Sequence, residues 1–407
     1  MEHTLNDFQK SSANPVTQAV RLMHNHSVPA VNIYGWDTPS LPLPSFSAAT
    51  FDAFWSRNIP VKITDVDSKF QGVWGPEYFV AQFGDVKVTL QDCEAEIAKT
   101  STVGEFFKTF GNQQVAERAT IMKLKDWPPE KHFSTQFPEL FKAFMDGVPY
   151  PDLARLDGVL NLAAHFPQNG IPPDLGPKMY NAHGSKHDNL HHGSTKLHID
   201  ITDAVNVLLW AADTADGELG GALWHIFPAV SAPEIRRFLT QVYDFRGPGD
   251  PIHSHSVYFT PEMLNNLEAQ CSIKPYVLFQ RPGEAVFIPA GSPHQVSNQT
   301  DAIKIACDFI SIANLAHTQN VVDELREQRL LSGWGDDVLQ FYTTLWYAWT
   351  SVSALATFPL LAQLRSLVPL RMKLYFPMDV STHILNNVPM TILDYCTRNN
   401  GGRTGTN

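Results

Sequence analysis

The sequence has few cysteines, and their placement excludes one class of metal site. Four cysteines occur among 407 residues, and no two of them form a C-x-x-C pair, so we expect no zinc finger. Cysteines used this sparsely are typical of a reducing compartment. The first ten residues, MEHTLNDFQK, lack a basic segment followed by an apolar core, so we expect no secretory signal.

The chain also has fewer basic than acidic residues. The chain has 30 Lys and Arg against 41 Asp and Glu, which gives a formal net charge of −11. Binding to a phosphate backbone needs a clustered basic face, so the composition argues against direct nucleic-acid binding. An acidic surface suits a cationic partner such as a Lys/Arg-rich peptide, although many enzymes are mildly acidic for solubility alone. Hydrophobic residues make up 43% of the chain, which permits a large core.

One long segment lacks charge altogether and requires a test of membrane insertion. Residues 338–364 are uncharged over a length that can span a bilayer. Several Gln, Thr and Ser residues interrupt the segment, and Pro359 would break or kink a helix there. We therefore expect a buried helical pair or an oligomer contact, and no membrane span.

Changes in residue composition and hydrophobic spacing divide the chain into four parts. From residue 178 onward, short apolar runs recur, each ended by Gly, Pro, Asn or Asp, which predicts a barrel or sandwich of short strands. The segments SAPEIRRFLTQVY and TPEMLNNLEAQC have helical spacing and are expected as helical insertions between strands. We therefore expect an N-terminal lead-in, a mixed α/β part, a β core and a C-terminal helical region, at residues 1–45, 46–177, 178–325 and 326–407.

The segment LHIDITD contains two candidate metal ligands. Strand alternation predicts that His198 and Asp200 project side by side from one face. A third candidate, His294, begins the strand that follows GEAVFIPAG. Two histidines and one carboxylate form the facial triad that holds octahedral Fe(II) and leaves three positions for substrate and oxygen.

Chance is the alternative explanation, because the chain has 16 histidines and an H-x-D pattern arises often without function. The position of both segments inside one predicted β core favours the metal site. The other histidines carry less weight. A solvated polar loop is expected for His191 and His192, and His183 and His187 flank that loop. Turn positions are expected for His253 and His255, and a satisfied interior position for His225.

Longer motifs resemble a known family. The segments PDLGPKMYNAHG, STKLHIDITDAVNVL, GGALWHIF, GEAVFIPAGSPHQVSN and IKIACDFIS together resemble the JmjC oxygenases. More narrowly, they resemble the histone demethylases that act on mono- and dimethylated lysine at the ninth position of histone H3. The resemblance also covers LKDWPPEKHF and PEYFVAQFGDVKVTLQDCE, and spans roughly residues 55–325.

The resemblance implies a fold and a set of cofactors. The fold is a cupin-like double-stranded β-helix, or jelly-roll, with an N-terminal mixed α/β region and C-terminal helices. The cofactors are Fe(II), 2-oxoglutarate and dioxygen, with His198, Asp200 and His294 as the iron ligands. In related oxygenases a Thr three residues before the first ligand contacts the cosubstrate, and Thr195 occupies that place.

The cosubstrate also needs a counter-charge, because burying a dicarboxylate without one is costly. Many JmjC relatives use a Lys at the start of the Trp-bearing strand, but that position holds Ala222 here. Alternation in AIKIAC points Lys304 inward, so we expect Lys304 to be the counter-ion; the alternative is an edge-strand lysine that faces solvent. Asn206 and Tyr180 are weaker candidates for the cosubstrate site.

The expected function is oxidative demethylation of a methylated lysine peptide, with the histone H3 tail as substrate and succinate, CO₂ and formaldehyde as products. An acidic or aromatic groove should hold the cationic methyl-lysine, and the candidates for it are Asp203, Glu218 and Asp308. The alternatives are a JmjC hydroxylase that acts on a non-histone protein and a catalytically silent chromatin-binding scaffold. Animal and plant relatives usually carry a Cys-rich zinc module before the catalytic domain, and this chain has none. Targeting is therefore expected to need a partner or a homodimer, and the nuclear location is expected by resemblance alone.

Overall fold

The computed structural model describes most of the chain between residues 38 and 355. The described ranges are 38–93, 95, 97–111, 120–129, 131–185, 193, 195–246, 249–332 and 338–355. The predicted lead-in therefore lies mostly outside the described residues, as do His187, His191 and His192. The chain forms two compact units: Met1–Ala164 with Asp174–Asp336, and His165–Pro173 with Asp337–Asn407.

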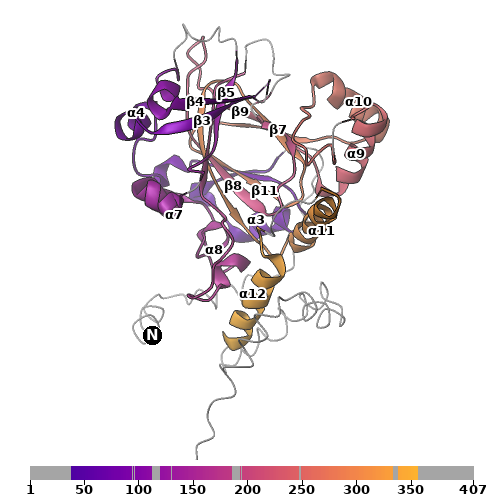
Figure 1. The fold of residues 1–407 in the computed structure, drawn as a ribbon. Helices are drawn as coiled ribbons and strands as arrows, with labels where there is room; N and C mark the ends of the chain where they lie inside the picture. The colour runs from indigo at the N-terminus through magenta and orange to yellow at the C-terminus, as the bar shows by residue number, and fades with distance from the viewer. Residues whose placement is uncertain are drawn as a thin grey trace, which may run out of the picture. The chain divides into compact units, whose positions relative to one another are not determined.

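Two β-sheets form the centre of the first unit (Figure 1). In spatial order the nine-stranded sheet contains β1 (Ser40–Pro42), β2 (Val61–Thr64), β11 (Glu284–Ile288), β8 (Asp203–Ala211), β13 (Ala302–Phe309), β6 (Lys178–Ala182), β5 (Met122–Trp127), β3 (Lys87–Asp92) and β4 (Ala98–Thr102). The four-stranded sheet contains β10 (Tyr276–Gln280), β9 (Ala222–Ile226), β12 (His294–Asn298) and β7 (Thr195–His198). The predicted β architecture with helical additions is confirmed.

Strands from the predicted mixed α/β part extend the larger sheet on both sides. β2 pairs with β11 at one side, and β5 pairs with β6 at the other. These pairings join segments that lie far apart in the sequence, so local patterns could not reveal them. The predicted domain boundaries stay predictions.

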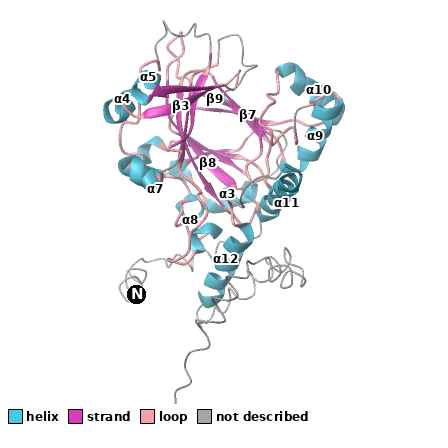
Figure 2. Ribbon diagram, in the orientation of Figure 1, coloured by secondary structure: helices cyan, strands magenta, loops and turns pink. Residues whose placement is uncertain are grey.

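Helices cover both sides of the sheets (Figure 2). One hydrophobic core packs the larger sheet against aromatic side chains such as Trp55, Phe79 and Phe144. The helices on this side are α3 (Ala48–Trp55), α4 (Pro76–Phe83), α5 (Val103–Phe107), α6 (Phe133–Gln136), α7 (Pro138–Gly147) and α8 (Pro151–Ala154). Burying an aromatic side chain of this size stabilises the fold by roughly 2–3 kcal/mol.

A second hydrophobic core forms beneath the inserted helices. Ile235, Phe238 and Leu267 are buried there, together with Leu197 of β7. The elements are α9 (Ala232–Gln241), α10 (Pro261–Cys271) and α11 (Leu315–Ser332), and both predicted helical insertions are confirmed. Short 3₁₀ turns complete the unit at Leu43–Ser45, Asp67–Lys69, Leu162–His165 and Ala229–Ser231.

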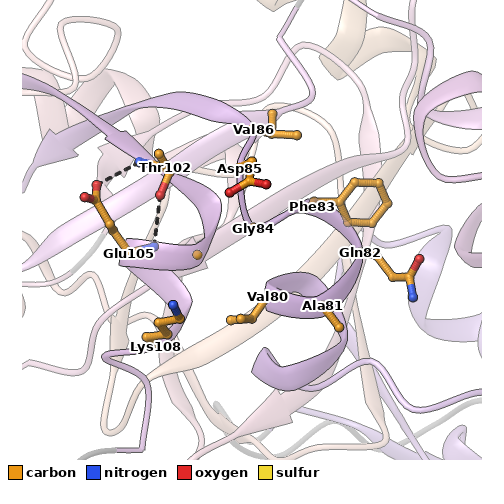
Figure 3. Close-up of a pocket in the computed structure, with 11 residues that line it drawn as sticks. Val80, Ala81, Gln82, Phe83, Gly84, Asp85, Val86, Thr102, Glu105 and Lys108 are labelled. Carbon is orange, nitrogen blue, oxygen red and sulfur yellow. Dashed lines mark hydrogen bonds between the residues drawn. The ribbon is translucent and has the colours of Figure 1, made fainter.

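The junction of α4 and α5 shows how the sequence sets helix ends (Figure 3). Thr102 Oγ1 accepts a hydrogen bond from the Glu105 amide, and the Glu105 carboxylate accepts one from the Thr102 amide, so a capping box begins α5. Gly84 is the C-cap of α4, and its φ of −52° is not left-handed. It is a glycine because a Cβ there would lie 2.5 Å from the Val80 carbonyl oxygen. The surface hollow of about 450 Å³ beside it contains none of the predicted site residues.

The second unit contains α12 (Phe341–Leu355), which covers part of the uncharged segment. Within this unit the rings of Phe166 and Tyr347 lie 5.0 Å apart, and Gln340 donates a hydrogen bond to the Ile171 carbonyl. No helix in the described part of the chain has the length and apolar character that a membrane crossing requires. Residues 356–364 lie outside the described residues.

Candidate metal centre and cosubstrate cavity

Three predicted ligands meet between two paired strands. His198 ends β7 and His294 begins β12, and the antiparallel register places them directly opposite each other, with ring centroids 4.1 Å apart. The Asp200 carboxylate lies 3.7 Å from His198 Nε2 and 3.6 Å from His294 Nε2. One ligand atom from each residue lies within 4.8 Å of the other two, so the three atoms can surround one cation.

The cluster forms for a slightly different reason than strand alternation predicts. β7 ends at His198, so Asp200 lies beyond the strand and not within it. The Gly291 amide donates a hydrogen bond to the Asp200 carbonyl at 3.2 Å, which ties the segment after β7 to the turn before β12. This backbone contact, rather than the period of two, holds the carboxylate beside both imidazoles.

The second ring nitrogen of each histidine is held by a backbone carbonyl. His198 Nδ1 lies 2.9 Å from the Lys196 carbonyl oxygen, and His294 Nδ1 lies 3.0 Å from that of Ser292. A carbonyl only accepts, so each Nδ1 carries the proton and each Nε2 keeps its lone pair for a metal. Burial also lowers the pKa of His198 well below its usual value, which keeps that imidazole neutral. The donor set therefore fits a divalent cation that prefers nitrogen and oxygen ligands.

A cavity of about 190 Å³ adjoins the metal cluster. His198 lines it, together with three of the four predicted cosubstrate residues: Thr195, Tyr180 and Lys304. Tyr180 and Lys304 are paired residues of β6 and β13, so their side chains project from the same face. Asn206 does not line this cavity, although its side chain is buried and its Oδ1 has no hydrogen-bond partner among the described residues.

Lys304 is a buried cation without a nearby carboxylate. It is 4% exposed on β13, an internal strand of the larger sheet, so the alternative of a solvent-facing edge lysine is wrong. Its Nζ donates a hydrogen bond to Asn298 Oδ1 at 2.6 Å and lies 5.6 Å from the centroid of the Trp224 ring. In the described part of the chain, no Asp or Glu forms an ion pair with Lys304, and burial lowers its pKa to about 7. A site of this kind favours an anionic ligand.

The structure adds cavity residues that the sequence interpretation missed. Asn298 lines the cavity, and alternation from His294 along β12 could have revealed it. His255, expected only as a turn residue, also lines the cavity, with its ring centroid 5.0 Å from that of His198. Its φ of 52° matches a turn, but no local signal brings that turn to the metal cluster.

An ion-pair network holds the turn that contains His255. Arg236 of α9 forms ion pairs with Asp250 in the turn and with Glu324 of α11. His253 Nε2 lies 2.9 Å from the Glu324 carboxylate, so His253 is also part of this network. The turn is thus fixed to two helices, which positions His255 at the cavity wall.

Two other expectations about single residues need correction. His225 is half-buried in β9, and its buried Nδ1 has no hydrogen-bond partner in the described residues, so the ring is not fully satisfied; burial lowers its pKa to about 4. Asp203, a candidate for holding a substrate cation, is used structurally instead. Its carboxylate accepts hydrogen bonds from the amides of Ala290 and Ser311 and from the Asn314 side chain.

Asp308 is the acidic candidate that lies beside the metal cluster. Burial raises its pKa well above the usual value, and the neighbouring charge of Asp200 raises it further. A hydrogen bond from Thr202 partly offsets this effect. The third candidate, Glu218, lies in an exposed turn after β8, away from both the cavity and the cluster.

Comparison with known proteins places this geometry in a family. The model of the family described as "JmjC domain, hydroxylase" matches residues 189–309, which include all three candidate ligands. Lysine-specific demethylase 3A of Homo sapiens is 34% identical over 338 residues, covering 73% of this chain and 26% of that protein. Lysine-specific demethylase 3 of Drosophila melanogaster is 33% identical, covering 73% of this chain and 40% of that protein.

A more distant relative agrees with this assignment. The probable JmjC domain-containing histone demethylation protein 2C of Homo sapiens is 29% identical over 344 residues, covering 73% of this chain and 13% of that protein. The chain thus spans less than half the length of these relatives. The range that the family model matches includes both histidine strands, β7 and β12, and the cavity residues Thr195 and Lys304, and the chain belongs to the JmjC-domain family.

Proposed function

We propose that this chain is an Fe(II)- and 2-oxoglutarate-dependent dioxygenase that demethylates lysine in the tail of histone H3. One observation carries the proposal: two imidazole Nε2 atoms and one carboxylate converge, and each histidine is locked by a carbonyl at Nδ1. Relatives named as lysine-specific demethylases support the reaction type. The name of a third relative, a probable histone demethylation protein, supports a histone substrate, so we propose a nuclear location.

His198, Asp200 and His294 would hold the iron. When bound, iron with 2-oxoglutarate and dioxygen supplies the oxidation that turns the cosubstrate into succinate and CO₂ and releases the N-methyl carbon as formaldehyde. The protein supplies orientation and a site shielded from water. The two Nδ1 hydrogen bonds keep the imidazoles in the tautomer that can coordinate iron.

Residues of the adjoining cavity would bind 2-oxoglutarate. Lys304 supplies the counter-charge for the carboxylate far from the metal, and Asn298 orients the ammonium group. Tyr180 and Thr195 add hydroxyl groups on the same cavity wall. Asn206 does not line the cavity, but its buried Oδ1, which has no partner among the described residues, can accept a hydrogen bond from an ordered water.

Asp308 is the residue we favour for attracting the substrate cation. A methylated lysine keeps its positive charge, and a cation placed near the buried Asp308 carboxyl would favour its ionised form. Asp203 and Glu218 lack this opportunity, because one is saturated with hydrogen bonds and the other is remote.

A panel of methylated histone H3 peptides tests the proposal. Each peptide is incubated with the protein, iron, ascorbate and 2-oxoglutarate, and peptide mass, formaldehyde and succinate are measured. Demethylation predicts loss of one CH₂ unit per turnover, with formaldehyde and succinate in equal amounts. Gain of one oxygen atom without formaldehyde would identify a hydroxylase instead.

Absence of 2-oxoglutarate decarboxylation with every peptide would favour a silent chromatin-binding scaffold. Targeting to chromatin is a separate question from turnover. We propose that a partner or a second copy directs this chain to chromatin. Co-purification from nuclear extract with and without the His198→Ala change separates targeting from turnover.

A further inference from the structure

We propose that Lys123, Lys125 and Lys196 form a cationic rim that captures the dianionic cosubstrate and steers it toward Lys304. The inference rests on the proposed function, because it assigns an entry route for 2-oxoglutarate to the same cavity. The rim would determine the association rate constant of 2-oxoglutarate, and Lys304 would determine its dissociation rate constant.

Two strands from different sheets supply the rim. Lys123 and Lys125 are two residues apart on β5, and Lys196 precedes His198 by two residues on β7. All three line the cavity that contains Lys304. The register of β5 with β6, Lys123 opposite Ala182, places Lys123 beside the strand that carries Tyr180. The rim therefore lies directly beside the candidate cosubstrate residues.

The lysines lie at successive depths. The Lys125 side chain is 43% exposed, Lys123 and Lys196 are half-buried, and Lys304 is buried. A dianion that enters from solvent thus meets a cation at each stage of its path. Charged walls of one sign in a partly desolvated cleft focus the field and raise association rates by one to three orders of magnitude.

The charge of the cavity is opposite to that of the chain. The sequence has 41 acidic and 30 basic residues, yet the described residues that line this cavity include four lysines and no Asp or Glu. Lys125 Nζ lies 3.4 Å from the Asp126 carboxylate, but the two side chains are 43% and 49% exposed, so water and salt screen that pair. An excess of cations at a cavity wall of an acidic protein indicates an anionic ligand.

The lysines of the rim repel one another, and a bound anion would reduce this repulsion. Burial lowers the pKa of Lys123, and the charges of Lys125 and Lys196 lower it further, although Cys93 and Asp126 act in the opposite direction. Like charges gathered in this way destabilise the empty cavity. The same field repels a positively charged methyl-lysine, so the rim serves the cosubstrate and not the peptide.

Binding kinetics without turnover test the proposal. Mn(II) replaces iron, and association and dissociation rate constants for 2-oxoglutarate are measured by stopped-flow tryptophan fluorescence, for which Trp224 is a local probe. The variant combines Lys123→Gln, Lys125→Gln and Lys196→Gln. We expect its association rate constant at low ionic strength to fall about tenfold and to lose most of its salt dependence. The dissociation rate constant should stay within about twofold of the wild-type value.

Two further variants test whether loss of any surface lysine has the same effect and whether positive charge alone restores binding. Lys142→Gln removes a lysine from α7 that is 78% exposed and does not line the cavity, and it should leave both rate constants unchanged. Arginine at the three rim positions should restore fast, salt-dependent association. If the triple glutamine variant fails to fold, Lys125→Glu at the exposed end of the rim should slow association and weaken its salt dependence.

Two results would overturn the proposal. One is an association rate constant in the triple variant equal to that of the wild type at low salt. The other is a change confined to the dissociation rate constant, which would make the lysines part of the final binding site. If the wild type binds no 2-oxoglutarate with any divalent metal, the proposed function itself is wrong, and the rim is not the cause.

Discussion

Lys304 and Asn298 join the two sheets through a hydrogen bond of 2.6 Å between the ammonium group and the amide oxygen. Lys304 belongs to β13 in the larger sheet, and Asn298 ends β12 in the smaller sheet. β12 also begins with His294, so the same strand positions a candidate metal ligand at one end and orients the buried cation at the other. This arrangement leads to predictions about charge, pH and metal.

Removing the charge of Lys304 is expected to weaken cosubstrate binding. In Lys304→Met, loss of a charged hydrogen bond costs about 1.5–3 kcal/mol, so the KM for 2-oxoglutarate should rise at least tenfold while the KM for peptide changes little. Lys304→Arg keeps the charge and serves as the control. Decarboxylation kinetics measure the effect, and an unchanged KM in the Met variant would contradict the counter-ion role.

Affinity for 2-oxoglutarate should fall as the pH rises above about 7. Burial lowers the pKa of Lys304 to about 7, so the free protein loses the cation above that pH, and binding then requires reprotonation. Affinity should drop by up to tenfold per pH unit until the pKa in the complex is reached. Calorimetric titrations between pH 6 and 9, with Mn(II) present, measure this slope.

The Lys304→Arg variant should lose that pH dependence, because arginine stays protonated throughout the range. The same shift has the opposite effect on stability. Between pH 7 and the ordinary lysine pKa, the unfolded chain binds the proton more tightly than the folded chain, so the free energy of unfolding rises with pH. If the free energy of unfolding changes with pH by the same slope in the wild type and in Lys304→Arg, Lys304 is not the titrating group.

Metal should stabilise the protein only when the triad is intact. A divalent ion that binds the folded state alone stabilises it by about 2.7 kcal/mol at one hundred times its Kd. We expect Mn(II) to raise the Tm of the wild type and not that of His198→Ala, which should also have no turnover. His132→Ala changes an exposed histidine and is the control. A metal-dependent Tm shift in His198→Ala would contradict the ligand assignment.

Asp203 is expected to matter for folding and not for ligand contact. Asp203→Ala leaves two buried amides and the Asn314 side chain without their acceptor, so the free energy of unfolding should fall by about 3 kcal/mol or more. Asp216→Ala, in an exposed turn, should change it by less than about 0.5 kcal/mol. Urea denaturation measures both, and similar values for the two variants would contradict the structural role.

The sequence predicted the features that depend on short-range patterns and long motifs. His198 and His294 begin or end strands of alternating character, and the inward direction of Lys304 follows from its apolar neighbours. The two inserted helices also have clear apolar spacing. These features follow from local periodicity, so they could be predicted before any contact was known.

Features that depend on distant pairings could not be predicted in this way. The approach of Lys123 to Lys196 requires β5 and β7 to meet at one cavity, and no pattern within either strand indicates that meeting. His255 reaches the metal cluster because Arg236 and Glu324 fix its turn, which depends on two helices on either side of it in the sequence. Such placements come from the packing of whole elements.

The position of β7 has a consequence for how long a metal stays bound. β7 is the last strand of the smaller sheet, so His198 has a neighbouring strand on one side only. On the other side, the Leu197 amide donates a hydrogen bond to the Val257 carbonyl at 2.8 Å, within the segment that Arg236 anchors through Asp250. We therefore expect the residence time of a bound ion to depend on the ion pairs of Arg236 between α9 and α11 as well as on the three candidate ligands, because local opening there would free His198 while the rest of the protein stays folded.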